Sequence, residues 1–232
     1  MSDSFGHYSR LADLFSYPDA GFAQKVQKVQ ALLDDGCGEA AENLREFTNF
    51  ASQASLLELE EVYTRSFDVQ AVTTLDIGYV MWGDDYKRGE LLVKLNGEHK
   101  EAGVDCGNEL PDHLPNVLRL LDAMEKPELR DELVQLLVAP ALRRIIGEFD
   151  SDRVKKKNIT YVTQYKTLID RSERYAEIYE KPLQTLYTLL KRDFDVDSYQ
   201  EQPAMQESRF LKSIGTEMRL ECNKGKCNGA TG

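Results

Sequence analysis

The sequence predicts an all-α protein, a single-domain helical bundle, from three observations. Apolar residues recur at intervals of three and four along most of the chain. The sequence lacks both the sustained alternation of half-buried strands and the fixed-length repeat of a solenoid. Its 232 residues, 41% hydrophobic and 30% charged, can supply one core. We predict a helical domain over 1–195 and a flexible or partner-ordered tail over 196–232.

The sequence of the N-terminal part predicts four successive helices. Apolar residues between 11 and 15 indicate a short helix that "SYPD" ends, and those between 22 and 33 indicate a second. A third spans about 39–53. Ser55 and Glu58 then form a capping-box pattern, in which a hydroxyl and a carboxylate satisfy unpaired backbone N–H groups. A fourth helix therefore begins after Ser55.

The remaining helices follow from further apolar stripes. One stripe covers 114–121, and a helix over about 128–149 contains Pro140, where we expect a kink or split. A tyrosine-rich stripe from 161 to 179 precedes a helix that has Pro182 in its first turn. Loops are expected at 68–73, 102–108 and 150–158, and after 196.

The charge balance restricts the possible partners. A net charge of -11 and a pI near 4.9 disfavour nucleic acid and anionic membrane surfaces. A basic peptide fits better, although excess acid also serves solubility alone. Residues 1–20 lack the apolar core of a secretory signal, and no stretch approaches the roughly 18 apolar residues of a membrane span. We therefore expect a cytoplasmic protein without stable membrane insertion.

The four cysteines are too few and too scattered for a disulfide framework. We interpret Cys37, Cys106, Cys222 and Cys227 as reduced thiols. Cys222 and Cys227 enclose four residues in a Gly/Asn/Lys-rich tail, which favours a metal-free segment. The alternative is a helical metal-binding or redox protein that uses these C-terminal cysteines with His113.

The sequence gives little support for a catalytic function. His7, His99 and His113 belong to no metal-ligand pattern, and no nucleophile elbow, P-loop or dinucleotide fingerprint occurs. The adjacent acids Asp34–Asp35 and Asp84–Asp85 do not face each other as catalytic carboxylates must. We predict neither an enzyme nor a resident cofactor or metal.

One loop carries a recognisable motif. In "ELPDHL", residues 109–114, Pro111 restricts the backbone and Asp112 is expected to cap the helix that follows. This motif resembles the E-x-P-D-H-L signature of the NarJ/TorD family, the cytoplasmic chaperones that mature molybdopterin-containing redox enzymes. Residues 63–92 are similar to the nitrate reductase delta-subunit branch of that family, as is the opening "YSRLADLFSYPD". The resemblance covers roughly residues 5–195.

The resemblance implies an all-α chaperone domain, a monomer or weak dimer, that catalyses no reaction. It implies binding of the N-terminal segment of a molybdopterin oxidoreductase catalytic subunit until cofactor insertion is complete. Such a peptide needs apolar anchors and carboxylates, as in helix-in-groove recognition. A break at Gly83 would let the chain turn and place Trp82 at the lip of a groove. The expected anchors are Tyr63, Phe67, Tyr79, Trp82 and Tyr86, the expected carboxylates are Asp76, Asp84, Asp85, Glu109 and Asp112, and His113 completes the set.

Overall fold

The computed structural model describes residues 6–150, 153–154 and 177–196, and within these ranges the chain is helical without a strand. The all-α prediction is therefore confirmed. The tyrosine stripe from 161 to 175, the tail after 196 and both of its cysteines lie outside the described residues. The division into a domain and a tail thus stays a prediction.

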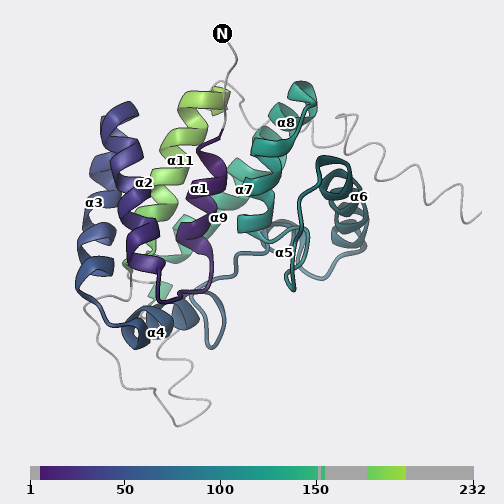
Figure 1. Ribbon diagram of the computed structural model, residues 1–232. Coiled ribbons are helices and arrows are strands. Elements are labelled where there is room, and N and C mark those ends of the chain that lie inside the picture. Colours follow the sequence, from purple (N-terminus) through teal and green to yellow (C-terminus); the bar gives the residue numbers. More distant parts are fainter. Residues whose placement is uncertain (1–5, 151–152, 155–176, 197–232) are drawn as a thin grey trace, which may run out of the picture.

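The helices follow one another with short connections. Their bounds are α1 (Tyr8–Ala12), the 3-10 turn η1 (Asp13–Phe15), α2 (Phe22–Gly36), α3 (Gly38–Gln53), α4 (Leu56–Phe67), α5 (Ile77–Trp82), α6 (Tyr86–Ala102), α7 (Leu114–Ala123), α8 (Pro127–Leu133), the π-helical turn η2 (Val134–Val138), α9 (Ala139–Glu148) and α11 (Glu180–Phe194). In the bundle, α2 packs against α3, α11 against both α3 and α9, and α1 against α7. Figure 1 shows α4 at one end and α6 at the edge, beside α5.

An aromatic cluster fixes one end of the bundle. The Tyr179 side chain is 1% exposed. Its ring centroid lies 4.8 Å from Phe67, 5.1 Å from Phe47 and 5.9 Å from Tyr63. Phe67 also meets Phe149 edge-on at 6.1 Å. Because these rings come from α3, α4, the end of α9 and the residue before α11, they join segments far apart in the sequence.

Local sequence signals set several helix boundaries as predicted. The Glu58 amide donates to Ser55 Oγ at 3.3 Å, and the Ser55 amide donates to Glu58 Oε2 at 2.8 Å, so the capping box is confirmed. The expected break at Pro140 is also confirmed. The Ala139 amide donates to the Val134 carbonyl, and this π-turn between α8 and α9 leaves room for a residue without an N–H.

Among the residues that the structure describes, no helix combines the length and the apolar character needed to cross a membrane.

Replacement of the central ring tests the role of the aromatic cluster. We expect Tyr179→Ala to lower the free energy of unfolding by about 3 kcal/mol, because it leaves a cavity beside the rings of Phe47, Tyr63 and Phe67. Tyr86→Ala removes a ring that is 61% exposed and should cost less than about 1 kcal/mol. Urea denaturation of both variants gives the comparison. Equal losses would contradict the placement of Tyr179 at the centre of the core.

Candidate functional site

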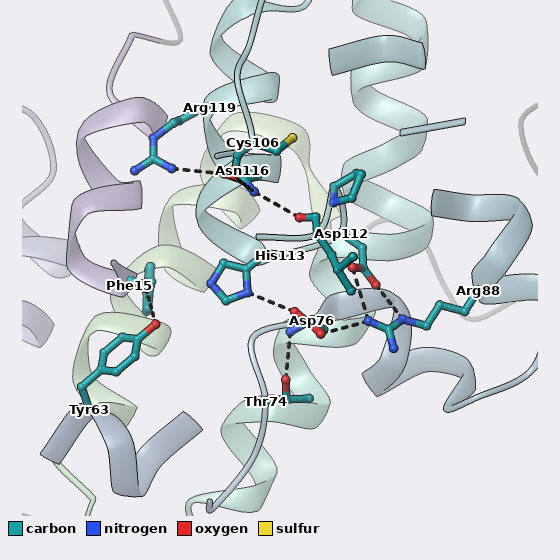
Figure 2. A network of polar contacts seen from close by, with 12 residues as sticks. Phe15, Tyr63, Thr74, Asp76, Arg88, Cys106, Asp112, His113, Asn116 and Arg119 are labelled. Atoms are coloured by element: carbon teal, nitrogen blue, oxygen red, sulfur yellow. Dashed lines mark hydrogen bonds and ion pairs between the residues drawn. The ribbon is translucent and has the colours of Figure 1, made fainter. Parts of the chain in front are cut away.

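The two segments with family-like motifs meet in the fold. Asp76 and His113 form an isolated antiparallel bridge. On either side of it, the Ile77 amide donates to the Asp112 carbonyl at 3.0 Å, and the Leu114 amide donates to the Leu75 carbonyl at 2.9 Å. The start of α5 is thereby fastened to the start of α7. Figure 2 shows the side chains that surround this junction.

Arg88 ties α6 to the same junction. Its Nε donates to Asp112 Oδ2 at 3.0 Å and its Nη2 donates to Asp76 Oδ2 at 2.9 Å (Figure 2). The Asp112 side chain is fully buried and that of Arg88 is only 15% exposed. The guanidinium also lies 5.2 Å from the centroid of the Tyr79 ring. One cation from α6 therefore holds carboxylates at the starts of both α5 and α7.

His113 completes the arrangement by engaging the second oxygen of Asp76. Its Nδ1 lies 3.0 Å from Asp76 Oδ1. Burial tends to raise the pKa of Asp76, but His113 and Arg88 outweigh it and hold this pKa below its ordinary value. At Asp112, burial dominates and raises the pKa despite the hydrogen bond from Arg88. The two carboxyl groups therefore differ in proton affinity although they share a partner.

Gly78 allows the close approach of α5 to Asp112. A Cβ added there would lie 2.6 Å from Asp112 Oδ2 and 2.9 Å from Leu91 Cδ2. Neither group has room to move, since Asp112 is paired with Arg88 and Leu91 is fully buried. The position therefore requires glycine.

Two polar residues hold the loop that precedes α7. The His99 ring, 1% exposed, places Nε2 3.0 Å from the Pro111 carbonyl. Because a carbonyl only accepts, Nε2 carries the proton, and burial lowers the pKa of this imidazole. Asn116 Nδ2 donates to the carbonyls of Cys106 and Leu110 at 3.2 and 3.1 Å. The loop is thus rigidly supported from α6 and α7.

Comparison with known proteins shows which of them this chain resembles. No family model matches the chain, but curated proteins do. The probable nitrate reductase molybdenum cofactor assembly chaperone NarJ of Bacillus subtilis (strain 168) is 30% identical over 120 residues, which cover 51% of this chain and 65% of that protein. Over that stretch, the chain is similar in sequence to this NarJ.

Two Escherichia coli (strain K12) proteins support this relationship. The probable nitrate reductase molybdenum cofactor assembly chaperone NarW is 27% identical over 158 residues, covering 67% of this chain and 63% of that protein. The chaperone NarJ is 26% identical over 163 residues, covering 68% and 66%. The chain thus spans slightly less than two thirds of the length of these relatives. The resemblance inferred from the two motif segments is confirmed, and the relatives are named as chaperones rather than as enzymes.

Three of the expected peptide contacts, Tyr63, Phe67 and Asp112, have buried side chains with partners inside the protein. Tyr63 is 7% exposed and its hydroxyl donates to the Phe15 carbonyl at 3.1 Å, while Phe67 is 9% exposed within the aromatic cluster. The prediction that Asp112 caps α7 is wrong. His113 is the N-cap residue of α7, and the Asp112 carboxylate accepts from Arg88.

The other expected contacts lie at or near the surface. Tyr79 is 43% exposed, Tyr86 is 61% exposed, and Trp82 is half-buried against the core. Asp85 is exposed and caps α6 by accepting from the Lys87 amide at 2.9 Å. The expected break is present, since Gly83 ends α5 with φ +62°. We refer to Tyr79, Trp82, Asp85 and Tyr86 as the α5–α6 turn residues. Asp84 and Glu109 are also exposed, whereas Asp76 and His113 belong to the Arg88 junction.

A hollow of about 860 Å³ lies between loop 68–74, α5 and α9. Its lining mixes apolar residues with charged ones, among them Arg143 and Arg144. Of the expected peptide contacts it includes only Tyr79. Arg144 Nη1 donates to the carbonyls of Val80 and Met81 at 3.2 and 3.1 Å, which links α9 to the end of α5.

The described residues contain no group of three or more His, Cys, Asp or Glu side chains placed to hold a metal ion. Cys37 and Cys106 are free thiols, and burial raises the pKa of Cys106. The alternative based on the tail cysteines concerns residues outside the described ranges.

Sequence reasoning missed the roles of Arg88, Gly78, His99 and Asn116. The Arg88 guanidinium is largely buried and pairs with two acids that are distant in the sequence. The available signal for Gly78 was a glycine between apolar residues at the start of α5. No sequence signal identified the long-range partners of His99 and Asn116.

Removal of the bridging cation should cost stability in a pH-dependent manner. We expect Arg88→Leu to lower the free energy of unfolding at pH 7 by about 3 kcal/mol, because Asp112 is left buried and unpaired. The pKa of Asp112 is already raised and rises further without Arg88. Its ionised form therefore costs stability above its pKa, and this cost disappears as the pH falls and the carboxyl gains a proton.

Urea denaturation between pH 7 and pH 5 measures the difference in the free energy of unfolding between the wild-type protein and this variant. We expect the difference to shrink toward pH 5 and to be partly removed by the double substitution Arg88→Leu/Asp112→Asn. A difference that is independent of pH would contradict the assignment of the cost to Asp112.

A methyl group added at Gly78 should destabilise the fold, whereas one added at an open helical glycine should stabilise it. Gly78→Ala is expected to lower the free energy of unfolding by roughly 1–3 kcal/mol through the contacts with Asp112 and Leu91. In α9, a Cβ at Gly147 would have no neighbour within 4 Å among the described residues, so Gly147→Ala should stabilise the fold by up to about 1 kcal/mol. Thermal unfolding compares the two, and a neutral Gly78→Ala would exclude the proposed close packing.

Proposed function

We propose that the chain is an assembly chaperone for a molybdopterin-dependent oxidoreductase, with a nitrate reductase as the client. The observation that carries this proposal is its homology to three proteins named as nitrate reductase molybdenum cofactor assembly chaperones. In this proposal the chain acts in the cytoplasm. It binds the N-terminal segment of the catalytic subunit, assists cofactor insertion and then releases the subunit without catalysing a reaction.

The peptide contacts in this proposal are the α5–α6 turn residues, with Glu109 on the neighbouring loop. Tyr79, Trp82 and Tyr86 supply apolar surface at the outside of the molecule. Burial of such surface contributes roughly 25 cal/mol per Å². Exposed ion pairs contribute only about 0–1 kcal/mol each. The aromatic rings therefore provide most of the affinity, and the carboxylates of Asp85 and Glu109 orient a basic peptide.

The charge of the chain supports recognition of a basic segment. A net charge of -11 accelerates the encounter with a positively charged peptide, an effect that salt reduces. Asp76 and Asp112 do not act as direct contacts in this arrangement, because Arg88 and His113 occupy them. They instead set the position of α5 and α6.

Peptide binding provides the test. We expect a synthetic peptide of the N-terminal segment of a nitrate reductase catalytic subunit to bind stoichiometrically in isothermal titration calorimetry. The double substitution Trp82→Ala/Tyr86→Ala should weaken binding at least about 30-fold, because aromatic residues at the centre of an interface contribute about 2 kcal/mol or more.

Tyr17→Ala/Leu57→Ala is the matched control. It removes two side chains that are 56% and 73% exposed and lie outside the α5–α6 turn. Its affinity should remain within about twofold of wild type, since it changes surface that does not contact the peptide. Full affinity in the Trp82/Tyr86 variant, with circular dichroism confirming the fold, would remove the turn from the site.

A further inference from the structure

The outer face of α6 is apolar and open in the part of the chain that the structure describes. Only Leu91, Leu95 and His99 of this 17-residue helix are buried. On the opposite side, Val93 is 70% exposed and Tyr86 is 61% exposed. Their spacing of seven residues places them on the same face of the helix. Two large apolar side chains exposed on one face of an otherwise charged helix offer a small contact surface.

Gly89 and Gly97 lie on the same face, each four residues from Val93. A Cβ at either glycine would have no neighbour within 4 Å among the described residues, so packing within this part of the chain does not require glycine there. Glycine in an exposed helix interior lowers helix stability relative to alanine. Glycines flanking an exposed valine do, however, allow a second helix to approach closely along the ridge of residues spaced by four.

The face is symmetric about Val93. Tyr86 precedes Val93 by seven residues and Lys100 follows it by seven, while Gly89 and Gly97 are equally distant from it. If two copies of α6 cross antiparallel at Val93, Gly89 of one copy meets Gly97 of the other. Tyr86 then meets Lys100 of the second copy, a cation–π pair. A two-fold contact requires such a self-complementary surface.

The charges favour the antiparallel arrangement over the parallel one. Asp85 and Lys87 are exposed at the N-terminal end of α6, and Lys100 and Glu101 are exposed at its C-terminal end. Antiparallel crossing brings Asp85 near Lys100 of the second copy, and Lys87 near its Glu101. The helix dipoles are also opposed. Parallel crossing would instead place Asp85 beside Asp85 and Lys100 beside Lys100.

We propose that α6 pairs antiparallel with α6 of a second copy and forms a weak two-fold homodimer. One helix pair buries less than the roughly 1,600 Å² of a standard interface, so dissociation is expected at roughly tens to hundreds of micromolar. The pairing covers Tyr86. On the basis of the proposed function, the homodimer therefore competes with the client peptide and is separated when the peptide binds.

Sedimentation velocity of the purified chain over a range of concentrations tests the dimer without any client. Wild type should show a concentration-dependent dimer. Val93→Glu and Val93→Lys should each raise the dimer dissociation constant at least about 100-fold, because two like charges meet at the two-fold axis. An equimolar mixture of the two variants should dimerise again, since unlike charges then meet there. Val69→Glu, at a 48% exposed position on another segment, should leave the dimer intact.

A wild-type chain that stays monomeric to about 1 mM would overturn the proposal, as would a dimer that persists in Val93→Glu. Failure of the mixed variants to dimerise would exclude pairing at Val93 and indicate that another occupant covers the face. Peptide calorimetry separates this result from the client proposal. Val93→Glu retains Tyr86 and should bind the peptide at least as tightly as wild type, whether or not the dimer exists.

Discussion

The junction depends on the hydrogen bonds that one guanidinium donates to two carboxylates. Asp76 and Asp112 are 36 residues apart in the sequence and meet at Arg88, where the Asp112 side chain has no access to water. Two carboxylates at such a place repel each other and lose their hydration. A cation between them offsets both costs. Arg88 supplies that cation, and its planar fork allows Nε and Nη2 to donate to different acids. Burial still leaves the pKa of Asp112 raised, which indicates the cost of the arrangement.

This constraint explains how α6 stays attached to the bundle. A helix with only three buried side chains gains little from apolar burial, and the polar contacts of Arg88 and His99 compensate. Because these contacts use its inner face, Tyr86 and Val93 remain on the outside. The inner face of α6 is held by two buried leucines and by the polar contacts of Arg88 and His99, which leaves its outer side chains available for reversible contacts. Both the proposed client binding and the proposed self-pairing depend on that outer surface.

The parts of the fold that could be predicted are those governed by neighbouring residues. The capping box at Ser55 and the break at Pro140 involve only a few positions along the chain, and the structure contains both. The apolar stripes likewise identified the buried faces of α2, α7 and α11. Short-range chemistry was sufficient because helix geometry fixes which nearby side chains meet.

Long-range partners were beyond such reasoning. The aspartate in "PDH" has the chemistry of a helix cap, and only the arrival of Arg88 from 24 residues away shows that it forms an ion pair instead. Tyr63 and Phe67 similarly resembled exposed anchors because periodicity gives a shared face but does not identify what covers it. In the fold, Tyr179 covers both.

Hydrogen–deuterium exchange with and without the client's N-terminal peptide tests the central claim most directly, namely that the Arg88 junction positions the α5–α6 turn for peptide binding. The account predicts slower exchange at residues 76–92 and 109–114 when the peptide is bound, with α2, α3 and α11 unchanged. Protection restricted to α2, α3 or α11, with residues 76–92 exchanging as in the free protein, would contradict it.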